Sequence, residues 1–281
     1  MPPHGLRCPF TYFSGNHAGE TCAEELDTEG THASTCKVGG GVGRKHDALV
    51  RLLARLLKAA GYEVATDGAG TWEPRWDRPA RDARGQQKRD AGGNLLWERA
   101  RLDLRLEGGP EEPTTYGDVV VSQARAESRV REGAAADGAA AREAKRRKQR
   151  RYPPEQGPNA KLVAFSVEAG GRWDEDALHF LKRAAGRASE RHPGLAALGS
   201  QGAAAVFSSW LAQLSCVLQK ANVACLRSAG ASGRCPSPGT QAEFAMPEGA
   251  DGAGHREVDD WLAEAVEALI HQAAASAGVD L

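Results

Sequence analysis

Two short segments with the residue pattern of β-strands constrain the fold of this chain more than any other feature. Residues 100–106 alternate leucine with charged residues, and residues 116–122 read YGDVVVS. A Gly/Pro/Glu-rich connection separates the two segments. Together they predict a β-hairpin in which Leu102, Leu104 and Leu106 share an apolar face.

The pairing of this hairpin decides where its two aspartates lie. If Leu106 pairs with Thr115, Asp103 faces Asp118 directly across the strands. Facing carboxylates repel each other unless positive charge lies between them. We therefore expect the pair to share a divalent cation, Mg²⁺ or Mn²⁺, because these ions take oxygen ligands. The alternative is that both aspartates lie on a solvated face of the sheet.

An ordered set of residues around the hairpin resembles a known family. The set consists of Arg101-x-Asp103, Asp118-Val-Val-Val, Lys148-x-x-x-Tyr152 and Phe165-Ser-Val-Glu168-Ala-Gly-Gly-Arg172. It resembles the zinc-knuckle and restriction-enzyme-like endonuclease region, of the PD-(D/E)XK type, in LINE-type (non-LTR) retrotransposon proteins. The resemblance covers about residues 17–190 and implies an α/β fold. Its restriction-endonuclease-like core would have a central mixed sheet flanked by helices.

The same resemblance implies roles for single residues. In that family an Arg/Lys-Pro-Asp motif and an acidic residue on the next strand hold the metal, and a lysine completes the site. Asp103 and Asp118 would then be catalytic and hold Mg²⁺, although Leu102 replaces the usual proline. Val120 stands where the simplest motif has its lysine. The lysine would therefore come from the following helix, as Lys148 or, second, Lys145.

A stretch rich in Cys and His precedes these motifs. His32 and Cys36 lie four residues apart, on one face of a helical turn, and Cys22 offers a third ligand for a structural Zn²⁺. Knuckles of the family run Cys, Cys, His, Cys, and a glutamate stands where the second cysteine would fall. The fourth ligand stays open among Cys8, His17, Glu24 and His46. The alternative is that these are loop cysteines that bind no metal.

Positive charge is segregated along the chain. The net charge is −1 over 281 residues, yet residues 142–151 hold seven Lys and Arg. A basic helix of this kind contacts the phosphates of DNA, or of RNA, and can also act as a nuclear-localisation stretch. A solvated charged face is the alternative. The candidate phosphate-binding residues are Arg44, Arg142, Arg146, Arg147, Arg150 and Arg151. Arg44 and His46 also match an Arg-His pair that follows the knuckle in the family.

The remaining segments complete the predicted architecture. Their patterns predict an amphipathic helix at 44–60 and a short strand at 62–65. They also predict a third strand at 161–167, a helix at 174–186, an apolar helix packed on the sheet at 200–228 and a final helix at 259–275. Residues 66–94 lack periodicity and are expected to form an insertion or loop.

Together with these patterns, the resemblance implies three parts. They are a zinc-knuckle-like segment, an endonuclease domain, and a helical C-terminal extension containing a linker at 229–250; they span residues 1–43, 44–190 and 195–281. No apolar stretch approaches the roughly 18 residues of a membrane span, so no membrane partner is expected.

The expected function is a metal-dependent DNA endonuclease that nicks DNA in the nucleus. Its family would supply an upstream reverse transcriptase, which this chain lacks, as a further partner. The rival expectation is a catalytically inactive, nucleic-acid-binding remnant of such an element. A third is an α/β protein with no nucleic-acid role.

Overall fold

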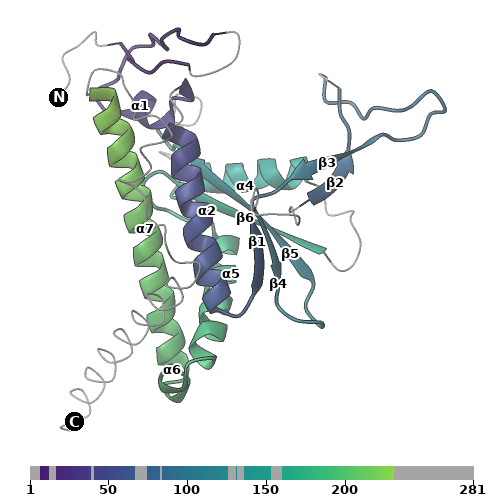
Figure 1. Cartoon of the computed structure of the whole chain (residues 1–281), viewed down its shortest axis with the longest axis vertical. Helices are drawn as coiled ribbons and strands as arrows, with labels where there is room; N and C mark the ends of the chain where they lie inside the picture. Colours follow the sequence, from purple (N-terminus) through teal and green to yellow (C-terminus); the bar gives the residue numbers. More distant parts are fainter. Residues whose placement is uncertain are drawn as a thin grey trace.

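The computed structural model describes residues 7–12, 17–38, 41–66, 75–82, 84–125, 131, 136–152 and 160–230. Within these residues the chain forms a mixed four-stranded sheet flanked by helices, as predicted (Figure 1). The predicted helix at 259–275 lies outside the described residues, and so does most of the predicted linker at 229–250.

The central sheet has the strand order β1-β4-β5-β6. These strands span Glu63–Thr66, Leu104–Glu107, Thr114–Ser122 and Ala160–Glu168. β1, β4 and β5 are antiparallel neighbours, whereas β6 runs parallel to β5. A parallel pair needs a crossover connection, and α4 (Ala139–Arg151) lies within the connection from β5 to β6.

Helices cover both faces of this sheet. The main core lies between one face and helices α2, α5 and α7, and it includes Leu53, Phe165, Leu181 and Trp210. These helices span Gly41–Ala59, Glu175–Glu190 and Ser200–Gly230, and the short α6 spans Pro193–Ala197. On the opposite face, α4 packs on β5 and β6. The predicted helices over 44–60 and 174–186 are thus confirmed, with ends shifted by a few residues.

The predicted register of the hairpin is confirmed. Leu106 pairs with Thr115 and Leu104 pairs with Gly117 in the β4–β5 ladder. A Cβ on Gly117 would come within 2.8 Å of the Phe165 ring and 3.0 Å of Leu104 Cβ. The close packing of strand β5 on the core therefore requires glycine at position 117.

The prediction of one continuous strand over 100–106 is wrong. β3 (Trp97–Arg101) ends before Leu102 and β4 begins at Leu104, with a bend between them. Leu104 and Leu106 enter the main core, but Leu102 packs with Tyr152 in a small separate cluster. Alternation places residues on one face only while the strand is unbroken, and the bend at 102–103 interrupts it.

The stretch at 66–94 contains a strand that its composition did not predict. β2 (Arg75–Pro79) pairs antiparallel with β3. Bridges between Arg81 and Gln87 and between Arg89 and Leu95 follow it. Figure 1 shows this arm extending away from the four-stranded sheet.

α7 packs mainly against α5 and α2 rather than on the sheet, contrary to prediction. By length and composition alone, Ser200–Arg227 could cross a membrane, with a mean hydropathy of 1.2 in its most apolar window. The expectation that no stretch is this apolar is therefore wrong. Trp210, Leu214 and Leu218 nevertheless lie in the common core.

Candidate functional site

Asp118 is a buried carboxylate on the α4 side of β5. Its residue surface is 4% exposed, and Lys148 Nζ lies 2.5 Å from its Oδ2. This contact is an ion pair outside regular hydrogen-bond geometry, so Oδ2 has no well-directed donor within the described residues. Burial raises the pKa of Asp118 to about 6, Lys148 opposes the rise, and the Asp103 charge adds to it.

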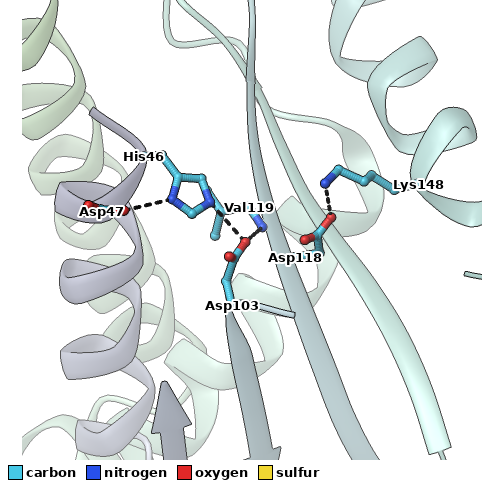
Figure 2. A network of polar contacts seen from close by, with 6 residues as sticks. All are labelled: His46, Asp47, Asp103, Asp118, Val119 and Lys148. Carbon is cyan, nitrogen blue, oxygen red and sulfur yellow. Dashed lines mark hydrogen bonds and ion pairs between the residues drawn. The ribbon is translucent and has the colours of Figure 1, made fainter. Parts of the chain in front are cut away.

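Asp103 lies at the bend just before β4, next to Asp118. Its Oδ2 accepts a 2.6 Å hydrogen bond from the backbone N–H of Val119. The same oxygen lies 3.0 Å from His46 Nε2, on the first turns of α2 (Figure 2). Asp103 therefore lies near enough to Asp118 for its charge to raise the Asp118 pKa, and each carboxylate is paired with a cationic group from a different helix.

His46 is held from both ring nitrogens. Its Nδ1 lies 3.1 Å from Asp47 Oδ1, while Nε2 contacts Asp103. The Asp103 hydrogen bond raises the pKa of His46 to about 9 against the opposing effect of burial. His46 is therefore charged at neutral pH and fixes the orientation of the Asp103 carboxylate.

The structure brings Lys148, and not Lys145, to Asp118. Lys145 Nζ instead lies 3.2 Å from Asp174 and 2.7 Å from Asp176 at the start of α5. Lys148 also lies 5.8 Å from the centre of the Tyr152 ring, which is buried at the end of α4. The ring and Asp118 together hold the Lys148 ammonium beside the site.

Glu168, at the end of β6, caps a helix rather than reaching the two aspartates. Its Oε1 accepts a 3.0 Å hydrogen bond from the backbone N–H of Ala140 in the first turn of α4. The N-terminus of α4 is thereby tied to β6, which helps to set the position of Lys148 farther along the helix.

The predicted phosphate-binding arginines are exposed, but several have partners. Arg146 and Arg150 pair with Glu143, Arg142 donates to the Asp137 carbonyl, and Arg151 lies over the Tyr152 ring. Arg147 is exposed on the same helix, and Arg44 is exposed on α2. The outer face of α4 is therefore strongly basic, with Glu143 as its single acidic residue.

A second site lies near the N-terminus. Cys8 and Cys22 come from two antiparallel segments joined by backbone hydrogen bonds, and His32 and Cys36 come from α1 (Thr31–Thr35) and its C-terminal cap. The four ligand atoms lie within 4.8 Å of one another. Cys8 Sγ is 3.8 Å from Cys36 Sγ, and Cys22 Sγ is 3.5 Å from His32 Nε2. Ligands about 2.3 Å from a tetrahedral zinc are roughly 3.8 Å apart, so this cluster is compatible with Zn²⁺.

The cluster selects Cys8 from the four candidates for the fourth ligand. His17 pairs with Glu20 on the surface, Glu24 is exposed, and His46 contacts Asp103. Burial raises the pKa of the Cys36 thiol to about 12 and also raises that of Cys8. Only a bound cation would make these buried thiols good thiolate ligands at neutral pH, so metal binding and proton release are coupled here.

Two side chains dock this Cys/His cluster on the sheet and α2. Lys45 is buried, and its Nζ donates a 3.1 Å hydrogen bond to the carbonyl of Ser34, between the ligands of α1. Gln123, just after β5, donates to Ser34 Oγ at 3.0 Å. Because Lys45 directly precedes His46, the same turn of α2 contacts both the Cys/His cluster, through Lys45, and Asp103, through His46.

Sequence reasoning missed the contact of His46 with Asp103 and could not choose Cys8. The match of Arg44 and His46 to a family pair was the signal that could have found the first. No such signal existed for Cys8, since it lies far from the other ligands along the chain.

A scan of this chain against models of known protein families finds no match, and a search of curated proteins finds none either. The functional conclusion therefore rests on the geometry of the two sites.

Proposed function

We propose that the protein is a metal-dependent DNA endonuclease with a restriction-endonuclease-like core, related to the nicking region of LINE-type retrotransposon proteins. The observation that carries this proposal is that Asp103 Oδ2 accepts a hydrogen bond from the N–H of Val119, the residue after Asp118, while Lys148 Nζ lies 2.5 Å from Asp118 Oδ2. Two carboxylates can hold a metal ion and a lysine can stabilise charge on the phosphate, so this set can support metal-assisted hydrolysis of a phosphodiester.

The donor set fits a hard divalent cation. Asp103 and Asp118 offer carboxylate oxygens, and Asp118 Oδ2 is buried without a well-directed hydrogen bond within the described residues. Mg²⁺ commonly binds through one or two carboxylates and a substrate phosphate. When bound, it supplies Lewis-acid activation of the phosphate and of water.

Each protein group has a separate task in the proposed site. The Val119 N–H and His46 orient the Asp103 carboxylate. The Lys148 ammonium, 2.5 Å from Asp118, stabilises negative charge that develops on the phosphate oxygens. Because Asp118 is buried, water competes little with these interactions.

The basic face of α4 and the Cys/His cluster would position the nucleic acid. Arg147 and its neighbours on α4 would contact the backbone phosphates, which gives salt-sensitive binding with little base information. A structural Zn²⁺ on Cys8, Cys22, His32 and Cys36 would hold the N-terminal segment in place.

Nicking of supercoiled plasmid DNA by matched lysine variants tests the proposal. Lys148→Met is expected to abolish Mg²⁺-dependent nicking. Lys145→Gln, which keeps a hydrogen-bond donor beside Asp174, is expected to retain it. If both variants are folded by circular dichroism and nick DNA equally well, the catalytic role of Lys148 is refuted, and the proposal with it.

A second candidate function is nucleic-acid binding without catalysis. One observation favours it: Lys148 and His46 already neutralise the two carboxylates that would hold the metal. In that case DNA binding would persist in Asp118→Asn protein, would fall steeply with salt, and no nicking would be seen with Mg²⁺ or Mn²⁺.

A further inference from the structure

β6 is an edge strand of the sheet, with β5 on one side. The C-terminal part of its outer edge is covered by the turn that leads into α5. There the Ser166 carbonyl accepts a 2.9 Å hydrogen bond from Asp174 N–H, and Glu168 N–H donates to the Arg172 carbonyl at 2.8 Å. The backbone groups of even-numbered residues in β6 therefore point away from β5.

By the same alternation, the N–H and C=O groups of Leu162 and Ala164 point outward. Within the described residues these outward groups accept and donate no hydrogen bond. Ala164 is nevertheless only 5% exposed. Neighbouring N–H and C=O groups that lack partners in such a recess favour a ligand that offers both an acceptor and a donor.

A pocket of about 290 Å³ lies along this part of the edge. α4 and α5 form its two walls, and β6 forms its floor, so it is a slot between two helices. Its lining residues include Lys145, Lys161, Leu162, Ala164, Asp176 and Arg183.

The rim of the slot carries excess positive charge. Lys145 lies against both Asp174 and Asp176, so these three groups together carry a charge of −1, and Lys161 and Arg183 bring the rim to +1. Lys161 and Arg183 are exposed and form no ion pair within the part of the chain that the structure describes. The slot therefore combines an unpaired strand edge with two cations at its mouth.

We propose that the β6 edge binds an extended, acidic segment of a partner protein by strand addition, independently of the nuclease chemistry. A peptide backbone satisfies both the outward N–H and the outward C=O groups of Leu162 and Ala164. Phosphate groups of a nucleic acid only accept hydrogen bonds, so they would leave the carbonyls unpaired. A second copy of the chain is disfavoured because α4 and α5 flank its own β6.

The experiment uses the full chain and a fluorescent synthetic peptide of alternating Glu and Val. The peptide is expected to bind, and amide exchange measured by NMR is expected to slow at Leu162 and Ala164. The same peptide with every second amide N-methylated is expected to bind about tenfold more weakly or worse, since each lost hydrogen bond costs about 1 kcal/mol.

Charge controls separate the slot from the general surface. Lys161→Glu is expected to weaken peptide binding about tenfold, whereas Lys182→Glu, at an exposed position of α5 that does not line the slot, leaves it unchanged. Equal binding of the N-methylated peptide would overturn the proposal. So would protection of the two amides by a DNA oligonucleotide but not by the peptide, or no binding of the peptide.

Discussion

Replacing Asp118 by asparagine removes a buried charge while preserving the shape of the side chain. The pKa of Asp118 is about 6 in the folded protein against a reference value of 3.8. This difference of about 2 pH units corresponds to roughly 3 kcal/mol at neutral pH. Because the folded-state pKa is raised, the folded protein holds this proton more tightly than the unfolded chain. The contribution to stability is complete below the unfolded pKa and is lost as pH rises through about 6.

The assay is urea unfolding of parent and Asp118→Asn protein in buffers free of Mg²⁺ and Mn²⁺. Between about pH 5 and about pH 8 the parent is expected to lose roughly 1 to 1.5 kcal/mol relative to the variant, since most of the titration lies below pH 6. Glu111→Gln, at an exposed position, serves as the control and is expected to follow the parent.

Adding Mg²⁺ at about pH 8 completes this test. Ligand binding to the folded state stabilises the parent, whereas the variant has lost one carboxylate and gains little. A stability difference between parent and variant that does not change with pH would refute the assigned burial of the Asp118 charge. A variant stabilised by Mg²⁺ as much as the parent would refute its role as a ligand.

Three further predictions follow from other parts of the structure. Cys8→Ser is expected to lower zinc affinity more than about 100-fold, because loss of a residue that merely hydrogen-bonds to a metal ligand already lowers metal affinity about 10- to 100-fold. Cys216→Ser, outside the cluster, is expected to keep one zinc per chain, as measured by mass spectrometry. Leu104→Ala is expected to destabilise the fold by about 3 kcal/mol in urea unfolding, and exposed Leu96→Ala by less than about 0.5 kcal/mol. Arg147→Gln is expected to reduce the slope of log affinity for duplex DNA against log salt by about 0.9, measured by fluorescence anisotropy.

The parts of the fold that could be predicted from sequence are those set by local residue patterns. The three- and four-residue spacing of leucines located α2, and Gly61, with φ of +82°, ends it as expected. The apolar run at 161–167 located β6. The register assumed for the β4–β5 hairpin, with Leu106 opposite Thr115, is the one that the structure has.

Contacts between distant segments could not be predicted in this way. Leu102 fits the alternation of its neighbours, and only packing against Tyr152 shows that the chain bends there. The sequence ranked Lys148 before Lys145 but could not show that Asp174 and Asp176 hold Lys145 at the start of α5. Cys8 reaches Cys36 only because the two paired segments that contain Cys8 and Cys22 fold against α1. The spacing of the cysteines along the sequence does not predict this contact.

The most direct test of the central claim is the anomalous scattering of Mn²⁺ in crystals of the protein grown or soaked in MnCl₂. The account predicts a peak bound by carboxylate oxygens of both Asp103 and Asp118, at about 2.0 to 2.2 Å, with Lys148 displaced from Asp118 Oδ2. Asp103 still paired with His46 and Asp118 still paired with Lys148, without a manganese peak between them at saturating MnCl₂, would contradict the shared metal site.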